Sequence, residues 1–175
     1  IRVEDGAATI LTRKGLDWTA KFAVIAKAAS ALPDCLIDGE AVVLDRDGAP
    51  DFGALQAALS DGNSAKLVFY AFDLLFAGGA DLRTLPLTER KARLRALLAG
   101  LAGKSGPLRY VEHLEKAGDA VLRSACQMKL EGIVPKELDA PYRSGRTGSW
   151  TKAKCRGGQE VVIGGWTSEG GTRLR

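Results

Sequence analysis

Two lysines separated by a single residue, Lys152 and Lys154, form the pattern with the clearest chemical meaning in the sequence. On a β-strand, alternate side chains point to one face, which places these two ammonium groups about 7 Å apart. Two like charges held side by side repel each other unless an anion lies between them, so the pair suits a phosphate group. The alternative is a solvated edge strand whose lysines discourage pairing with other chains. Arg146 and Trp150 precede the pair and slightly favour phosphate binding.

Carboxylates occur in two further segments that could do chemistry. Asp38 and Glu40 alternate along a strand predicted over 35–45, where they need a metal, a hydroxyl or a cation to offset desolvation. Glu131 begins a short apolar run that ends in Lys136, so a divalent cation could bind the first and phosphate the second. Structural interpretations without chemistry remain open for both segments. Asp38-Gly39 could be a turn beside a solvated Glu40, and Glu131-Gly132 could end a helix before a core strand.

An aromatic strand could supply a surface for stacking on a base. Residues 66–76 are rich in aliphatic and aromatic side chains, as a buried strand would be, and Tyr70 and Phe72 share one face. Asp73 interrupts the apolar run on the opposite face. Stacking on a purine and packing in the core are both compatible with these rings.

The elements that must position these residues alternate irregularly along the chain. Apolar spacing predicts helices over 22–32, 52–59, 88–101 and 117–125, the third with Thr88 as its N-cap. Strands are predicted on both sides of Asp5-Gly6, over 35–45 and 66–76, near Val111, and over 133–134, 151–154 and 160–166. Because hairpins outnumber uniform βαβ units, the predicted class is α+β with largely antiparallel sheets.

Composition narrows the class of protein. With 175 residues, 46% of them hydrophobic, the chain can bury one substantial core. The net charge of +4 mildly favours a polyanionic partner. No apolar run approaches ~18 residues, so we expect no membrane partner and a cytoplasmic setting. Cys35, Cys126 and Cys155 form no CxxC or Cys/His cluster, so neither a disulfide nor a zinc site is predicted, and the first two should pack as small apolar side chains.

Together and in this order, these segments resemble the motifs of the covalent nucleotidyltransferases, which comprise DNA ligases, RNA ligases and mRNA capping enzymes. Asp38-Gly39-Glu40 resembles motif III, residues 69–75 motif IIIa, residues 131–136 motif IV and residues 150–154 motif V. Residues 12–19 resemble the motif Ia stretch, with an amino-acid sequence close to that of bacterial ligase D. Residues 87–91 match a helix start common in DNA ligases.

The resemblance implies both a fold and a reaction. The fold would be an ATP-grasp-like nucleotidyltransferase core of largely antiparallel sheets flanked by helices in residues 1–156, followed by the start of an OB-fold barrel in residues 157–175. In the reaction, a lysine attacks the α-phosphate of ATP, AMP passes to the 5′-phosphate of a DNA nick, and the 3′-hydroxyl displaces it. ATP and Mg²⁺ or Mn²⁺ are the implied cofactors.

The resemblance also implies partners and residue roles. Nicked double-stranded DNA is the expected partner, in DNA repair, recombination and non-homologous end joining, together with Ku, fused polymerase or phosphoesterase modules, and a bacterial, nucleoid-associated location. The implied roles are ribose or metal contact for Glu40, adenine stacking for Phe72, metal binding for Glu131, phosphate binding for Lys136, α-phosphate binding for Lys152 and Lys154, and nucleotide or DNA contact for Arg13 and Arg146.

One family motif has no counterpart in the sequence. Motif I has the form Lys-x-Asp-Gly, and Glu4-Asp5-Gly6 fits only its second half, with Val3 in place of lysine, so a hairpin turn is the better interpretation. We therefore expect a fragment truncated at both ends, with the nucleophilic lysine upstream and little activity of its own. The alternatives are an RNA ligase or capping-type guanylyltransferase, and a noncatalytic nucleic-acid-binding relative.

Overall fold

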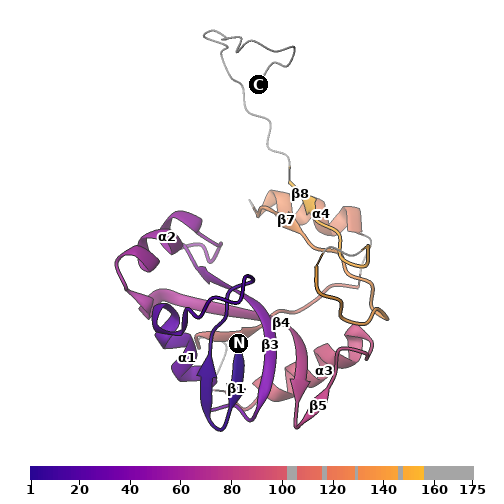
Figure 1. Ribbon diagram of the computed structural model, residues 1–175. Coiled ribbons are helices and arrows are strands. Elements are labelled where there is room, and N and C mark those ends of the chain that lie inside the picture. Colours follow the sequence, from indigo (N-terminus) through magenta and orange to yellow (C-terminus); the bar gives the residue numbers. More distant parts are fainter. Residues whose placement is uncertain (102–105, 116–117, 129, 146–147, 156–175) are drawn as a thin grey trace, which may run out of the picture.

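The computed structural model describes residues 1–101, 106–115, 118–128, 130–145 and 148–155 (Figure 1). The strand predicted over 160–166, the domain boundary at residue 156 and Arg146 lie outside these residues. No helix in the described part of the chain is long and apolar enough to cross a membrane.

A six-stranded sheet forms the body of the fold, in the order β2-β1-β3-β4-β5, with β6 paired to β4. Its strands are β1 (Arg2–Glu4), β2 (Ala7–Thr9), β3 (Cys35–Val43), β4 (Leu67–Ala77), β5 (Ala80–Asp81) and β6 (Leu108–Tyr110). Every pairing in it is antiparallel except that of β4 with β6. The predicted α+β class with largely antiparallel sheets is therefore confirmed.

The hairpin predicted at the beginning of the chain joins β1 to β2. Asp5 and Gly6 both have positive φ angles, 50° and 74°. A two-residue turn between right-handed twisted strands requires this conformation, which Asp and Gly adopt more readily than other residues. Glu4-Asp5-Gly6 thus serves as a turn, as the sequence indicated.

Helices connect the strands, and α1 and α3 pack against the main sheet. They are η1 (Thr19–Phe22), α1 (Ala23–Ala29), α2 (Phe52–Ser60), η2 (Ser64–Lys66), α3 (Leu87–Leu98) and α4 (Gly118–Gln127). Ile25 of α1 and Leu94 of α3 are completely buried, so both helices contribute to the core. The predicted cap of α3 is wrong: Thr88 lies inside the helix, and its amide donates to the carbonyl of Leu138 at 3.2 Å.

A second, two-stranded sheet lies beside α4 and apart from the strands of the main sheet (Figure 1). It consists of β7 (Gly132–Ile133) and β8 (Ala153–Lys154). Gly132 has a φ of 154°, and a Cβ there would lie 2.1 Å from the carbonyl oxygen of Ala153. Close pairing of β7 with β8 therefore depends on the missing side chain at this position.

Cys126 and Cys155 form a disulfide, so the expectation of no disulfide and the prediction that Cys126 packs as a small apolar side chain are both wrong. Their Cα atoms lie 5.4 Å apart although 29 positions separate them in sequence, because α4 and β8 meet only in the folded chain. Cys35 is a buried free thiol, 4% exposed, and packs as a small apolar side chain as predicted.

Candidate functional site

The two lysines of the predicted phosphate-binding pattern share one anion. The ammonium groups of Lys152 and Lys154 lie 3.0 Å and 3.1 Å from the same carboxylate oxygen of Glu131. The two ammonium groups are thus held around an anion, as the sequence predicted, and this anion is the side chain of Glu131. Hydrogen bonds from Lys152 and then Lys154 hold the pKa of Glu131 below its ordinary value. All three side chains are exposed.

An aromatic cluster surrounds the ammonium group of Lys136. Its Nζ lies 4.2 Å from the ring centroid of Phe72 and 3.7 Å from that of Trp150. The ring of Trp150 meets those of Phe72 and Tyr142 edge-on, at centroid distances of 6.1 Å and 6.0 Å. The structure therefore brings the proposed stacking residue Phe72 together with segments more than sixty residues away in the sequence.

Phe72 owes its orientation to an irregularity in the pairing of β3 with β4. Asp38 pairs with Asp73, whereas the next residue, Gly39, pairs with Ala71, so Phe72 is an extra residue in β4. Such a bulge redirects the side chain and locally increases the twist of the strand. Phe72 is accordingly only half-buried, between two neighbours that are fully buried.

Gly39 allows the two strands to approach each other at this point. A Cβ at position 39 would lie 2.3 Å from Cζ of Phe69 and 2.6 Å from the carbonyl oxygen of Tyr70. A glycine between the two carboxylates of Asp38-Gly39-Glu40 is therefore a steric requirement of the sheet.

Burial sets the electrostatics of the aromatic cluster. Desolvation lowers the pKa of Lys136 to about 8, although the carboxylates of Asp73 and Asp38 favour its charged form. Burial also raises the pKa of Asp38, which accepts a hydrogen bond from the hydroxyl of Tyr142 at 3.3 Å. Tyr142 was not among the site residues predicted from the sequence. Together these groups form a largely desolvated cation beside aromatic rings, a setting suited to a planar, anionic ligand.

Comparison with known proteins identifies the family of the chain. The family model of the ATP-dependent DNA ligase domain matches residues 1–154. The chain is 44% identical over 174 residues to the multifunctional non-homologous end joining protein LigD of Pseudomonas aeruginosa, covering 98% of this chain and 20% of that protein. It is 31% identical over 168 residues to the SPbeta prophage-derived DNA ligase-like protein LigB of Bacillus subtilis, covering 94% and 60%. The chain belongs to the ATP-dependent DNA ligase family.

Solved structures agree with the family assignment. A mycobacterial DNA ligase D complexed with ATP and MES superposes with a TM-score of 0.77 at 32% identity, covering 94% of this chain and 53% of that one. The ligase domain of Mycobacterium tuberculosis LigD superposes with a TM-score of 0.72 at 31% identity, covering 85% and 47%. The fold is thus that of a DNA ligase nucleotidyltransferase domain. The chain spans about one fifth of the length of the LigD proteins it matches.

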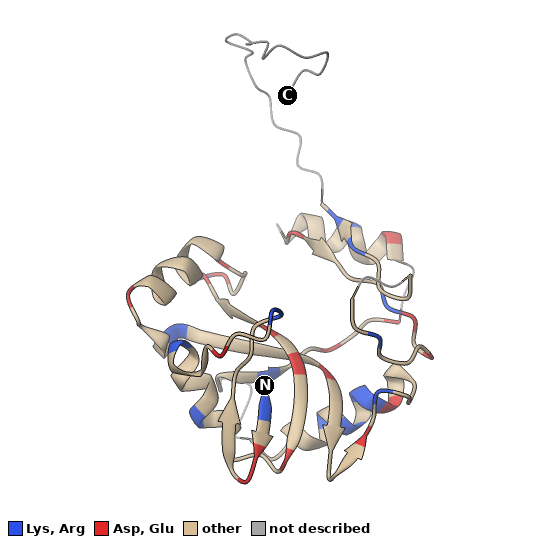
Figure 2. Ribbon diagram, viewed as in Figure 1, with Lys and Arg blue, Asp and Glu red and all other residues tan. Residues whose placement is uncertain are grey.

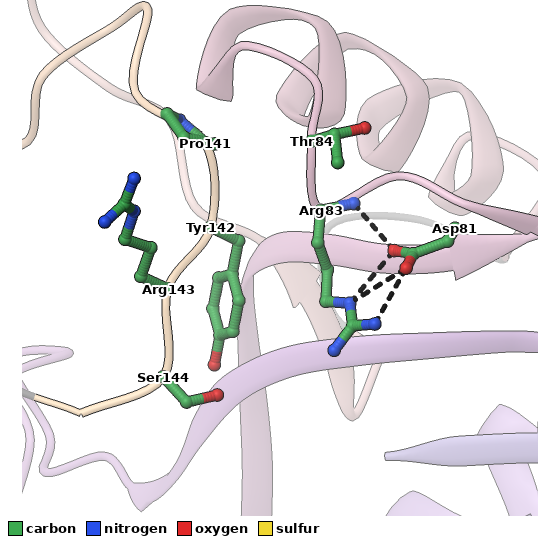
Figure 3. Close-up of a pocket in the computed structure, with 7 residues that line it drawn as sticks. All are labelled: Asp81, Arg83, Thr84, Pro141, Tyr142, Arg143 and Ser144. Carbon is green, nitrogen blue, oxygen red and sulfur yellow. Dashed lines mark hydrogen bonds and ion pairs between the residues drawn. The ribbon is translucent and has the colours of Figure 1, made fainter.

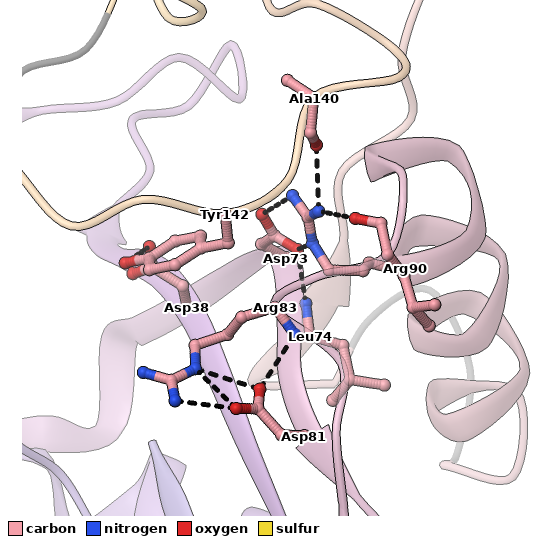
Figure 4. Close-up of polar contacts among 9 residues, drawn as sticks. Asp38, Asp73, Leu74, Asp81, Arg83, Arg90, Ala140 and Tyr142 are labelled. Carbon is pink, nitrogen blue, oxygen red and sulfur yellow. Dashed lines mark hydrogen bonds and ion pairs between the residues drawn. The ribbon is translucent and has the colours of Figure 1, made fainter.

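Within this ligase domain, Asp73 has a structural partner that the sequence did not reveal. Arg90 of α3 donates from Nε and Nη2 to the two carboxylate oxygens of Asp73, at 2.8 Å and 3.0 Å, and both side chains are 0% exposed. Its Nη1 donates to the carbonyls of Leu85 and, at 3.1 Å, Ala140 (Figure 4). The arginine thereby fastens α3 to the segment that carries Tyr142.

Two other predicted site residues lie apart from these clusters in the ligase domain. Glu40 is exposed on β3 opposite Tyr70, and Arg13 is exposed in the connection between β2 and η1. Neither has a described contact with Lys152 or Lys154. Figure 2 shows the acidic positions in the middle of β3 and the basic positions gathered along α3.

The donor groups fit a metal held largely by its substrate. Among the described residues, no three His, Cys, Asp or Glu side chains gather around one point. Mg²⁺ is commonly held by one or two carboxylates together with substrate phosphates and water. Glu131, exposed and kept ionised by two lysines, suits that mode of binding.

A separate hollow of about 450 Å³ lies between the β5–α3 connection and residues 141–144. It is lined by Asp81, Arg83, Thr84, Pro141, Tyr142, Arg143 and Ser144. Figure 3 shows the Tyr142 side chain extending toward Ser144, while Arg83 is bound to Asp81 at 2.7 Å and the side chain of Arg143 points away. Of the predicted site residues that the structure describes, none lines this hollow, and among its lining residues Tyr142 also belongs to the aromatic cluster.

Proposed function

We propose that the protein to which this chain belongs seals nicks in double-stranded DNA through lysyl-AMP and DNA-adenylate intermediates. Membership of the ligase family supports the reaction class. The observation that carries the proposal is the convergence of Lys152 and Lys154 on one carboxylate oxygen, at 3.0 Å and 3.1 Å. Two cations already arranged around an anion need little reorganisation to stabilise a reacting phosphate.

In this proposal, the α-phosphate of ATP takes the place of the Glu131 carboxylate between the two lysines. Glu131 then turns toward a bound Mg²⁺ or Mn²⁺, which supplies positive charge that offsets the charge of the phosphoryl group. Glu40 contacts the ribose, and Arg13 and Arg146 contact DNA or nucleotide phosphate.

Adenine stacks on Phe72 in this proposal, and this has a consequence for Lys136. The ammonium group now lies 4.2 Å from the Phe72 centroid. A base on the same ring face displaces it, and the freed ammonium becomes available to neutralise phosphate. A planar base that replaces a desolvated lysine retains the aromatic contact and allows the charge to return to water.

The pathway is proposed from the relatives. Several are named as non-homologous end joining proteins. We propose a role in that form of DNA repair and recombination, in the bacterial cytoplasm and associated with the nucleoid, with Ku and fused polymerase or phosphoesterase modules as partners. The 175 residues contain no Lys-x-Asp-Gly, so this chain alone is expected to bind ATP weakly and to form no covalent AMP.

Transfer of labelled AMP in the complete protein tests the roles. Lys154→Ala and Glu131→Ala should each lower the rate of AMP transfer by about a hundredfold or more, as expected when one group that stabilises the reacting phosphate is lost. Lys27→Ala, on the exposed side of α1, is the matched control and should leave the rate unchanged. Normal adenylylation by either site variant would refute these assignments.

A noncatalytic DNA-binding relative is the second candidate, because Lys-x-Asp-Gly is missing from these residues. It predicts DNA binding by the complete protein without any transfer of label from ATP. Preference for GTP, or sealing of nicked RNA but not of nicked DNA, would instead favour a capping-type enzyme or an RNA ligase.

A further inference from the structure

The disulfide between Cys126 and Cys155 encloses the chemical groups of the site. Cys126 lies near the end of α4, and Cys155 follows β8 directly. The loop of chain that the bond closes contains the twin lysines and their anion, and also Lys136, Tyr142 and Trp150 of the aromatic cluster, whose fourth member Phe72 lies in β4. Formation or loss of this bond can therefore affect the position of each of these groups.

Few other interactions fix β8 to β7. The ladder consists of two residue pairs, Gly132 with Lys154 and Ile133 with Ala153. The amides of Cys155 and Thr151 donate to the carbonyls of Glu131 and Pro135 at 2.8 Å and 3.1 Å, and one isolated bridge joins Lys136 to Trp150. The ion pairs of the lysines are exposed, and exposed ion pairs contribute little stability. The covalent bond is thus a large part of what holds the lysine strand in register.

We propose that Cys126 and Cys155 form a reversible redox latch. When the disulfide is present, it holds β8 and the adjoining Lys152 against β7. Both side chains are half-buried, so a small thiol or disulfide can reach them. Reversibility rests on the proposed function, since a DNA ligase works in a reducing compartment, where disulfides are mostly transient. The Cα separation of 5.4 Å lies within the range that a disulfide can span.

The bond forms by two thiol–disulfide exchanges with oxidised glutathione as the oxidant. The thiolate of Cys155 attacks one sulfur of glutathione disulfide, which forms a mixed disulfide and releases one glutathione thiolate. The thiolate of Cys126 then attacks the Cys155 sulfur and releases the second glutathione. Two protein thiols are oxidised, one glutathione disulfide is reduced to two thiols, and the two cysteine protons pass to the released thiolates.

Hydrogen exchange on the chain, equilibrated in glutathione buffers of different ratio, tests the latch. In oxidising buffer we expect a Cys126–Cys155 peptide that is two hydrogens lighter than the two thiol peptides, and this bond should be lost in reducing buffer. Reduction should speed exchange of the Thr151 and Cys155 amides by about tenfold or more, as expected when a local opening becomes easier. Amides of β3 and β4 should keep their rates.

Serine variants provide matched controls. Cys126→Ser should exchange like the reduced chain in both buffers, whereas Cys35→Ser, at the buried free thiol, should respond like the unaltered chain. The latch is refuted if no bond forms at any glutathione ratio, if the bond persists in reducing buffer, or if β8 exchanges equally in both states. If the complete protein binds no ATP in either the oxidised or the reduced form, yet the β8 amides still exchange faster after reduction, the proposed function is refuted and the latch is supported.

Discussion

Replacing Lys136 with methionine should change how the stability of the fold depends on pH. Burial lowers the pKa of this lysine from its ordinary value of 10.5 to about 8. At about 1.4 kcal/mol per tenfold change in proton affinity, that shift corresponds to roughly 3 kcal/mol at pH values where both states are protonated. The folded chain bears this cost below pH 8 and is free of it once the lysine is neutral in both states.

The sign follows from proton binding. Between pH 8 and 10.5 the unfolded chain keeps the proton that the folded chain has released, so stability rises with pH. Methionine has a similar shape and no charge, and its variant lacks this rise. The free energy of unfolding of the unaltered chain, minus that of Lys136→Met, should therefore increase by about 2.5 kcal/mol between about pH 7 and pH 10.

Urea unfolding followed by circular dichroism at several pH values measures this difference. Lys21→Met is the matched control, because Lys21 also lies over an indole ring, at 4.4 Å from the Trp18 centroid, but is exposed. Its difference from the unaltered chain should stay nearly constant with pH. A flat difference for Lys136→Met would show that its ammonium group is not desolvated between Phe72 and Trp150, and would refute the reasoning.

Three further substitutions test the framework around the site. Arg90→Met leaves the buried carboxylate of Asp73 without its counter-ion and should lower the free energy of unfolding in urea by about 3–5 kcal/mol. Arg93→Met, in an exposed pair with Glu89, should lower it by less than about 1 kcal/mol. Equal effects would contradict the burial of the Arg90–Asp73 pair. Gly132→Ala should separate β8 from β7, seen as loss of amide protection at Cys155, because its Cβ would clash with the facing carbonyl. Tyr142→Phe removes the hydroxyl that donates to Asp38 on β3 and should destabilise the fold by about 1 kcal/mol. An unchanged unfolding midpoint would exclude that hydrogen bond.

Local patterns were sufficient for much of the fold. The Asp5-Gly6 turn, the long apolar strand that became β4 and the helix that begins at Phe52 were predictable, because each depends on neighbouring residues. The alternation of Lys152 and Lys154 likewise predicted that the two ammonium groups would face one anion. Order along the chain was enough to indicate the ligase family, since motif spacing is a property of the sequence itself.

Only the tertiary structure decided which groups meet. In the sequence Asp73 only interrupts an apolar strand, whereas in the structure Arg90, 17 positions away, pairs with it and makes it part of the core. The anion between the lysines is Glu131, and the disulfide joins positions 29 apart. Partners distant in sequence leave no local pattern, because the pairing of strands and helices that brings them together is set by burial of the whole core rather than by their neighbours. Sequence therefore determined the chemical types and their order, and packing determined their contacts.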